Sequence, residues 1–427
     1  MLGIFLGVMI ALFVAGFPVA IAIGLTCLAV LVAQGGIGAV STELFAARML
    51  SGINSFPIIA IPFFILAATL MNVGSATSRI FDFANGLVGH IRGGLGHVNV
   101  LASMIFAGMS GTAAADAAGL GQLEIKAMNE RGYPLWFSTG ITGASSVIGP
   151  IIPPSVAMVV YGWLSGASVA ALFIASIVPG ILLGLALMAM VYAYSFRIEM
   201  PVSPRPAARE LLGLARRAFL PLLTPGIIVG GIWSGIFTPT ESGAIASIYA
   251  FVLGAVFYRE IGWQETVSVL RSTVMFTSVI LFIIAIATFY GWLLVRLRIP
   301  QDLAMWLVGF DVGPTVLLMG MMVFFLVIGC FMSVVEAVLI FTPIFVVSLQ
   351  ALGIDPVYFG VLMVLSLSVG VITPPFGNVI YILVSITRQP YEVVVMSLLP
   401  FLIPILAVIV LLVLVPSLVT FLPGLGG

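Results

Sequence analysis

Long apolar stretches separated by short polar connections extend over the whole chain. A membrane-spanning helix needs about 20 consecutive apolar residues, and several stretches reach that length, while others are shorter or are interrupted by glycine and proline. Strands of an outer-membrane barrel would instead alternate apolar and polar residues. The pattern predicts an all-α polytopic membrane protein with about ten to fourteen helical elements. The stretches cover residues 2–33, 52–74, 97–118, 134–165, 169–195, 219–236, 242–258, 273–295, 303–329, 333–350, 357–387 and 393–422.

The composition narrows the possible functions. The 427 residues are 62% hydrophobic and 7% charged, with a mean hydropathy of +1.30, which leaves too few charges to cover a soluble surface. Fifteen basic residues balance fifteen acidic ones, so nucleic acid is not an expected partner. Lys126 is the only lysine, and it lies outside any phosphate-loop motif. Without a nucleophile or metal-protease motif, the sequence predicts neither an enzyme nor an organic cofactor.

Two of the apolar stretches are interrupted in the same way. GPIIPPS begins at Gly149, and GVITPPFGN begins at Gly370, in the other half of the chain. Proline removes a backbone donor and frees a carbonyl one turn earlier, while glycine lets the chain turn. In lipid, an interrupted helix is stable only inside protein or beside a polar cavity, because every backbone polar group needs a partner. The ends of such half-helices offer carbonyls to a cation and N–H groups to an anion.

The offset between Gly149 and Gly370 also relates other helix breakers, although overall identity between the halves is low. Thr112 falls on Ser333 at this offset. We therefore predict two inverted structural repeats, each with a re-entrant hairpin followed by a broken helix. The alternative, that the prolines only kink packed helices, stays open. The matched pairs are Gly108 with Gly329, Gly132 with Gly353, Gly149 with Gly370, Pro153–Pro154 with Pro374–Pro375, and Pro179 with Pro400.

A stretch rich in small residues precedes each break. GMSGTAAADAAGLGQ contains Asp116, and GCFMSVVEAVLIFTP contains Glu336. Small residues allow the close packing of a hairpin. An isolated carboxylate at membrane depth costs about 2.5–3.5 kcal/mol unless it is paired or functional, so both acids are candidates for chemistry or for capping a neighbouring helix. A third acid, Glu241, follows Pro239 and Thr240 and is more typical of the first turn of a helix.

One hydrophilic linker, RIEMPVSPRPAARELLGLARR, divides the chain near its middle. It extends from Arg197 to Arg217 and contains five arginines against two glutamates. Basic residues accumulate in cytoplasmic loops, so we expect this linker in the cytoplasm. The predicted regions are N-terminal scaffold helices at 1–75, the transport region of the first repeat at 80–195, the linker at 196–217, scaffold helices of the second repeat at 218–300, and the second transport region with a C-terminal helix at 301–427.

Four motifs, GMSGTAAADAAGLGQ, GPIIPPS, GIFTPTESGA and GVITPPFGN, together resemble the large membrane subunit of TRAP (tripartite ATP-independent periplasmic) transporters. The resemblance covers essentially the whole chain. It implies an elevator-type secondary transporter of the bacterial inner membrane that imports small organic anions, carboxylates in particular, with Na⁺ as coupling ion. It also implies a small membrane subunit on a separate chain, a periplasmic substrate-binding protein and contact with membrane lipid as partners. A stand-alone Na⁺- or H⁺-coupled carrier of related fold, or a channel, remains an alternative.

The expected sites lie where each hairpin tip meets a broken helix, because a hydroxyl that faces freed carbonyls gives Na⁺ neutral oxygen ligands. The roles of Asp116, Glu241 and Glu336 are left open. The residues expected to bind Na⁺ are Ser110, Thr112, Gly149, Pro150, Pro153, Ser333, Gly370, Thr373 and Pro374. Those expected to contact substrate are Ser110, Ser155, Gly377 and Asn378.

Overall fold

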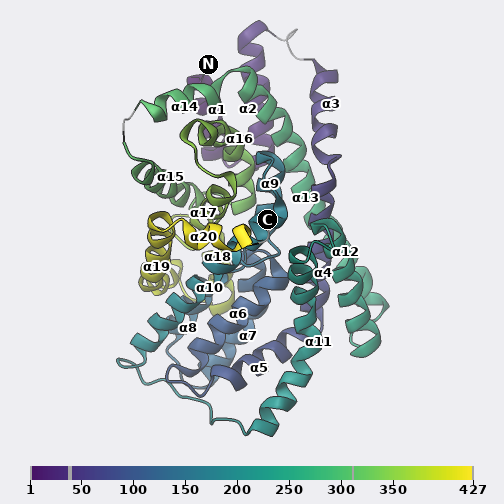
Figure 1. The fold of residues 1–427 in the computed structure, drawn as a ribbon, viewed down its shortest axis with the longest axis vertical. Coiled ribbons are helices and arrows are strands. Elements are labelled where there is room, and N and C mark those ends of the chain that lie inside the picture. The colour runs from purple at the N-terminus through teal and green to yellow at the C-terminus, as the bar shows by residue number, and fades with distance from the viewer. Residues whose placement is uncertain (1, 37–40, 310–311, 426–427) are drawn as a thin grey trace.

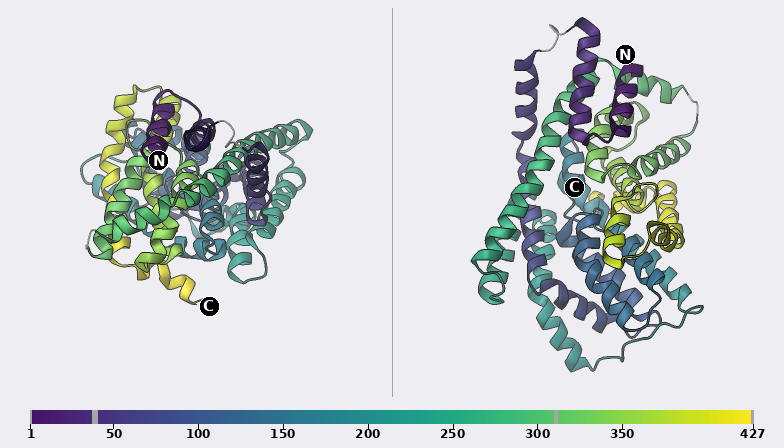
Figure 2. Two further views of the ribbon diagram at one scale, coloured as in Figure 1. Left: turned by 90° about the horizontal axis from the view of Figure 1, so that it is seen from above. Right: turned by 180° about the vertical axis from the view of Figure 1, so that it is seen from behind.

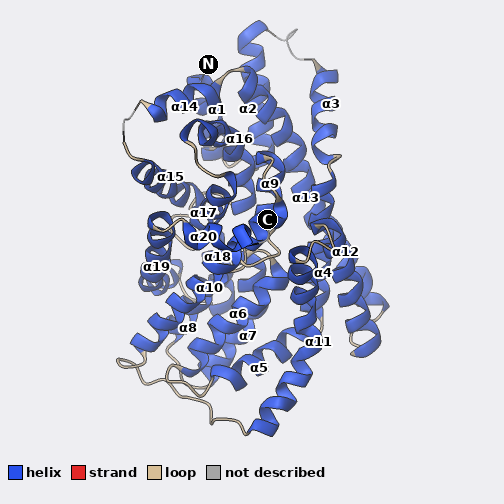
Figure 3. Ribbon diagram, viewed as in Figure 1, coloured by secondary structure: helices blue, strands red, loops and turns tan. Residues whose placement is uncertain are grey.

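The structure is a computed structural model that describes residues 2–36, 41–309 and 312–425. Within these ranges the chain forms helices joined by turns and loops, without a strand, as Figure 3 shows. The all-α prediction is therefore confirmed. Residues 1, 37–40, 310–311 and 426–427, which belong to the predicted scaffold and transport regions, lie outside the described residues.

The described residues before the arginine-rich linker form ten α-helices and one short 3₁₀ helix. They are α1 (Leu2–Val14), α2 (Val19–Gly35), α3 (Thr42–Ile53), η2 (Phe56–Ile59), α4 (Ala60–Val73), α5 (Ala76–Val88), α6 (Gly94–Ser110), α7 (Ala113–Glu130), α8 (Leu135–Ser146), α9 (Val156–Ser165) and α10 (Val169–Tyr194).

The remainder forms a second series with the same order (Figure 1). Its elements are α11 (Ala208–Trp233), α12 (Pro239–Val252), the π-helix η3 (Leu253–Phe257), α13 (Trp263–Arg296), α14 (Ile299–Val308), α15 (Pro314–Gly329), α16 (Val334–Leu352), α17 (Pro356–Gly370), α18 (Asn378–Thr387), α19 (Tyr391–Leu414) and α20 (Ser417–Leu425).

The bounds of these elements recur at the same constant offset as the helix breakers. Helix α7 begins at Ala113 and α16 begins at Val334, while α8 begins at Leu135 and α17 at Pro356. At this offset the single helix α13 matches three elements of the first half, α3, η2 and α4. Both Pro-Pro pairs lie between the matching half-helices, and each contains a cis peptide bond. The two halves thus fold into the same order of elements, with the breaks at equivalent places.

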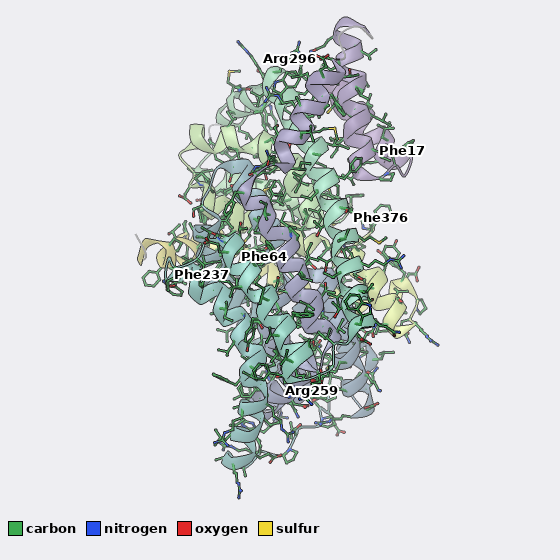
Figure 4. All side chains as sticks on the ribbon, turned by 90° about the vertical axis from the view of Figure 1, so that its right-hand side faces the viewer. Phe17, Phe64, Phe237, Arg259, Arg296 and Phe376 are labelled. Carbon is green, nitrogen blue, oxygen red and sulfur yellow. The ribbon has the colours of Figure 1, made fainter. Side chains whose placement is uncertain are left out.

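Among the described residues, six helical stretches are long and apolar enough to cross a membrane. The longest is α13, whose 34 residues extend about 51 Å, well beyond the ~30 Å hydrocarbon core of a bilayer. It packs against α2, α3 and α4, beside which it runs in Figure 2. Arg259, which precedes it, and Arg296, its last residue, lie far apart along the molecule in Figure 4. The six stretches are Phe56–Val73, Val169–Tyr194, Ala208–Trp233, Pro239–Phe257, Trp263–Arg296 and Tyr391–Leu414.

The helices that precede the two breaks, α8 and α17, are the most enclosed part of the fold. Every residue of α17 from Tyr358 to Gly370 is buried, and so is every residue of α8 from Phe137 to Ser146. The half-helices after the breaks cross to the opposite half, since α9 packs against α16 and α18 packs against α7. Tyr161 of α9 donates a hydrogen bond of 2.7 Å to the carbonyl of Pro356 at the start of α17. The two halves are therefore interlocked rather than merely adjacent.

The predicted linker is helical over its second half, because α11 begins at Ala208. Its irregular first half runs along the lower end of the molecule in Figure 1 and is attached to the base of the first hairpin. The Ser203 N–H donates to the carbonyl of Gly89 (2.9 Å), and the Ser203 hydroxyl donates to Asn85 Oδ1 (3.0 Å). The Tyr133 hydroxyl donates to the carbonyl of Pro201 (2.5 Å). This half of the linker is thus held in place by specific hydrogen bonds.

A polar cluster joins the start of α5 to the loop between η3 and α13. Glu260 accepts a hydrogen bond of 2.6 Å from the backbone N–H of Ser75 and lies 3.8 Å from the Arg79 guanidinium. The guanidinium also lies over the ring of Tyr258, 3.8 Å from its centroid. Partial burial acts to raise the pKa of Glu260, but the hydrogen bonds from Ser75 and the charge of Arg79 outweigh it and lower this pKa below its usual value.

We expect Glu260→Gln to lower the melting temperature of the purified protein at neutral pH by a few degrees or less, because Glu260 is largely exposed. A lowered pKa means that the charged Glu260 stabilises the fold above its unfolded-state pKa, and that this contribution is lost as the pH falls through the folded-state value. The difference between the two proteins, measured by thermal unfolding, should therefore shrink as the pH falls below about 4.5. A difference that grows on acidification would contradict this.

Candidate functional site

The tip of the first hairpin, between α6 and α7, contacts the first break through backbone atoms. Gly111 has a positive φ of 64° and lies so close to the break that an added Cβ would be 2.7 Å from the carbonyl oxygen of Pro154. An added Cβ on Gly149 would be 2.9 Å from the carbonyl oxygen of Thr112. Only glycine allows these approaches without displacing the backbone. The first tip and the first break therefore meet through backbone atoms.

The second tip, between α15 and α16, contacts the second break more closely still. An added Cβ on Gly370 would be 2.3 Å from the backbone of Gly329, and one on Gly329 would be 2.4 Å from the carbonyl oxygen of Leu367. The N–H of Gly377 donates a hydrogen bond of 3.1 Å to the carbonyl of Cys330. Gly149 and Gly370, equivalent in the two halves, thus both lie at a close contact between tip and break.

The hydroxyls predicted to bind Na⁺ differ in what they contact. Ser110 Oγ is buried and has no hydrogen-bond partner among the described residues. Thr112 is the N-cap of α7 and accepts from the N–H of Ala115 (3.2 Å). Thr373 donates to the carbonyl of Val369 (2.8 Å), which leaves its oxygen lone pairs free. Ser333 is half-buried at the second tip. The first tip therefore contains a buried polar atom that needs a partner.

The residues predicted to contact substrate lie in two environments. Ser155 is fully buried, and its hydroxyl accepts from the N–H of Met158 (3.3 Å) as the N-cap of α9. Asn378, the first residue of α18, is exposed. The positions equivalent to Ser110 and Ser155 in the second half are Phe331 and Phe376, each 54% exposed, with ring centroids 5.9 Å apart. The second tip therefore presents an aromatic pair where the first presents buried hydroxyls.

The three acids named from the sequence have distinct surroundings. Glu241 is exposed and forms a capping box with Thr238, whose N–H donates to Glu241 Oε2 (2.8 Å). Glu336 Oε2 accepts from the N–H of Ser333 (3.0 Å) at the start of α16. Both contacts are those of helix-capping acids. Asp116 is buried, and its Oδ2 accepts from Ser103 Oγ (2.9 Å), whereas its Oδ1 has no partner among the described residues.

Asp116 belongs to a buried polar network that the sequence does not reveal. Ser103 Oγ also lies 3.1 Å from Ser145 Oγ, the Ser145 hydroxyl donates to Asn99 Oδ1 (2.8 Å), and the Asn99 amide donates to Thr142 Oγ1 (2.7 Å). The network joins α6, α7 and α8 inside the first hairpin. Glu124, farther along α7, is 1% exposed, and neither of its carboxyl oxygens has a partner within the described part of the chain. No spacing motif marks these residues in the sequence.

The second half builds the equivalent region mainly from apolar side chains, and of the network only Ser145 has a polar counterpart, Ser366. Ser103 corresponds to Phe324 and Glu124 to Phe345, and these two rings lie 5.8 Å apart between centroids. Asp116 corresponds to Ala337, Asn99 to Gly320 and Thr142 to Met363. Since a hairpin of the same order folds without the polar network, the network is not a requirement of the fold.

Six candidate membrane spans among the described residues, two interrupted helices and two tips that meet the interruptions are typical of a membrane transporter. Comparison with known proteins gives the family. Residues 6–418 match the model of the DctM component of tripartite ATP-independent periplasmic transporters. The chain belongs to this family, and it is an integral inner-membrane permease subunit rather than an enzyme.

Curated relatives agree with this assignment over nearly the full chain. The sialic acid TRAP transporter large permease protein SiaM of Vibrio cholerae is 41% identical over 416 residues, which cover 97% of each protein. The C4-dicarboxylate TRAP transporter large permease protein DctM of Pseudomonas aeruginosa is 38% identical over 384 residues, or 90% of each. The sialic acid TRAP transporter permease protein SiaT of Haemophilus influenzae is 38% identical over 378 residues, which are 61% of its length.

A solved structure shares the fold at low sequence identity. The YdaH transporter of Alcanivorax borkumensis superposes with a TM-score of 0.63 at 16% identity, over 87% of each chain. At this identity the likeness shows the fold alone. It indicates that the helical arrangement described here also occurs in a transporter of distant sequence.

We expect Gly370→Ala to destabilise the protein by about 1–3 kcal/mol, because the new methyl group would overlap the backbone of Gly329 at the second tip. Gly320→Ala is the matched control, since no atom lies within 4 Å of the position of its added Cβ in α15. Thermal unfolding of the purified variants measures the difference. Equal melting temperatures for the two variants would contradict the close contact between tip and break.

Proposed function

We propose that the chain is the permease subunit of a Na⁺-coupled, binding-protein-dependent importer of small organic anions. The observation that carries the proposal is the meeting of each hairpin tip with a broken helix through glycine backbone contacts, beside the unpartnered hydroxyl of Ser110. Breaks of this kind supply carbonyl oxygens without a net charge. A small hard cation is the ligand that neutral oxygens suit best.

The proposed cation sites are built from equivalent parts of the two halves. In the first proposed site the ligands are Ser110 and Thr112 with the break from Gly149 through Pro150 to Pro153, and in the second they are Ser333 with the break from Gly370 through Thr373 to Pro374. One positive charge that moves inward down about 100 mV supplies about 2.3 kcal/mol. A few such ions per cycle would drive accumulation of an anion without ATP.

The substrate proposal rests on the ends of the half-helices. N–H groups at the starts of α9 and α18 carry partial positive charge and favour a carboxylate. Ser110, Ser155, Gly377 and Asn378 remain the proposed contacts, and Asn378 is the one with an exposed side chain. Relatives named as sialic acid, C4-dicarboxylate and 2,3-diketo-L-gulonate transporters support an organic acid as the substrate class.

We further propose an elevator movement, in which the hairpins and half-helices move as one group against the scaffold helices. The two halves would be inverted repeats. The element bounds, which match between the halves at the offset of the helix breakers, support the repeat. The partners we expect are a small membrane subunit on a separate chain and a periplasmic substrate-binding protein, as the word tripartite in the family description suggests. A stand-alone carrier would instead transport without the binding protein.

Thr373→Val tests the cation sites. It deletes one oxygen and little volume, so we expect the Na⁺ concentration for half-maximal uptake to rise roughly fivefold, the effect of about 1 kcal/mol. Ser110→Ala should act in the same direction at the first tip. Uptake into proteoliposomes, with the two expected partners added, measures this. Thr387→Val is the matched control, because Thr387 makes the same type of bond to the carbonyl four residues before it, away from the break.

Unchanged Na⁺ dependence in both site variants would show that the breaks do not bind the coupling ion. Uptake that needs a Na⁺ gradient but no binding protein would favour the stand-alone carrier. Passive conductance would favour a channel.

Cysteine labelling tests the orientation and the inversion. Arg205→Cys lies in the exposed part of the linker, and the native Cys27 and Cys330 are buried, so background labelling should be low. We expect a membrane-impermeant thiol reagent added to intact cells to label Val312→Cys but not Arg205→Cys. Val312 is exposed and equivalent to Ile91 at the linker end of the first hairpin, so inversion places it on the opposite side. Labelling of both from one side would contradict the inversion.

A further inference from the structure

A basic pocket lies where the end of α10 and the first residues of the linker meet the base of the first hairpin. It encloses a volume of about 590 Å³. Three arginines line it, Arg92, Arg131 and Arg197, while Glu199 is the one acid among its lining residues. The rest of the wall is formed by Gly132 and by residues 195, 196, 198, 200 and 201. The pocket therefore carries an excess of positive charge.

Hydrogen bonds orient two of these arginines without neutralising them. Arg92 donates from Nε to the carbonyl of Ser195 (3.2 Å), and its guanidinium lies 4.4 Å from the ring centroid of Phe196. Arg131 donates to the hydroxyl of Ser203. The ion pairs found among the described residues are Arg79 with Glu260 and Lys126 with Glu130, so no acid lies within 4.0 Å of the three pocket arginines there. Guanidinium groups in such a setting suit a phosphate, whose oxygens match their paired donors.

Exposed aromatic side chains place the pocket at the boundary between lipid and water. Helix α10 is one of the six candidate spans and ends at Tyr194. Tyr192 and Phe196 are 47% and 59% exposed, with ring centroids 5.1 Å apart, and Trp136 beside Tyr194 is 37% exposed. Tyrosine and tryptophan gather at the level of lipid head groups. The arginines therefore lie at the depth where lipid phosphates lie.

Among the described residues, the second half has no equivalent of this pocket. Arg92, Arg131 and Arg197 correspond by the constant offset to Gly313, the N-cap of α15, to Leu352 at the end of α16 and to Leu418 in α20. Helix α20 packs mainly on α10 and α17 rather than on α15 and α16. The arginine-lined pocket is therefore specific to the first half.

We propose that this pocket binds the phosphate head group of an anionic phospholipid, with the acyl chains lying along the exposed rings of Tyr192 on α10 and Phe196 just after it. Basic pockets at the ends of membrane helices recognise such head groups. Because the linker forms one wall and Arg131 also holds Ser203, the bound lipid fastens the linker to the base of the first hairpin. The site is separate from the proposed cation sites at the hairpin tips.

The experiment measures lipid binding to the full chain by native mass spectrometry and by thermal unfolding, with phosphatidylglycerol or phosphatidylcholine added to protein in detergent. Phosphatidylglycerol should raise the melting temperature, and phosphatidylcholine should not. In Arg92→Gln/Arg131→Gln/Arg197→Gln the apparent affinity for phosphatidylglycerol should fall by about tenfold or more, since three positive charges that pair with the phosphate are removed. The matched control, Arg205→Gln/Arg209→Gln/Arg216→Gln, removes three exposed arginines outside the pocket and should leave the affinity unchanged.

Further measurements distinguish a lipid phosphate from free phosphate and keep the test valid if the triple variant does not fold. Inorganic phosphate that stabilises the protein as well as phosphatidylglycerol does would overturn the lipid assignment in favour of a free anion. Equal losses in the two triple variants would overturn the pocket in favour of general surface charge. If the triple variant does not fold, Arg197→Gln alone, whose side chain makes no hydrogen bond within the described residues, should weaken binding, while Glu199→Gln should strengthen it. Failure of both single variants to change binding would overturn the proposal.

Discussion

The need to satisfy backbone polar groups inside a membrane governs this structure. Each Pro-Pro pair ends a helix in an apolar region. The backbone carbonyls and N–H groups at the break then have no water with which to form hydrogen bonds. In this fold a hairpin tip packs against each break. At Gly329 and Gly370 the contact is so close that neither position has room for a side chain. The hydrogen bonds of Gly377 to Cys330 and of Val379 to Val371 satisfy some groups at the second break.

The half-helices that follow the breaks connect these two contacts, because each packs against the opposite half of the chain. Because α9 packs on α16 and α18 on α7, each half-helix after a break contacts the hairpin of the opposite half. A second set of helices, α2, α3, α4, α12 and α13, packs mainly within itself. The molecule thus contains one interlocked group that carries both breaks and a second group beside it, with α13 against α16 and α4 against α6 as points of contact between them. Such a division is what an elevator step would require.

Much of this arrangement could be predicted from the sequence, because helix breakers act locally. Gly149, Gly370 and the Pro-Pro pairs mark the ends of elements whatever surrounds them, so the breaks and the offset between the halves could be predicted. The Asn99–Thr142 contact could not, since single serine, threonine and asparagine residues in apolar helices carry no spacing signal. Glu124 lies in EIKAMNE, a stretch that is typical of an exposed helix face, and only the packing of α7 against its neighbours buries it. The linker is expected as one hydrophilic segment, but its prolines end at Pro206, and the residues from Ala208 onward form the start of α11.

The comparison of the hairpins separates what the backbone needs from what the side chains add. Both halves place a glycine at the closest approach and a helix break behind it, so this geometry is the shared solution. Inside the hairpins the solutions diverge, with Ser103 and Glu124 in one and Phe324 and Phe345 in the other. A buried carboxyl group without a partner is costly, whereas an aromatic pair contributes favourably. Stability alone would therefore favour the aromatic pair in both hairpins. The polar interior of the first hairpin therefore reflects a demand other than folding, and that demand acts on one half of the molecule only.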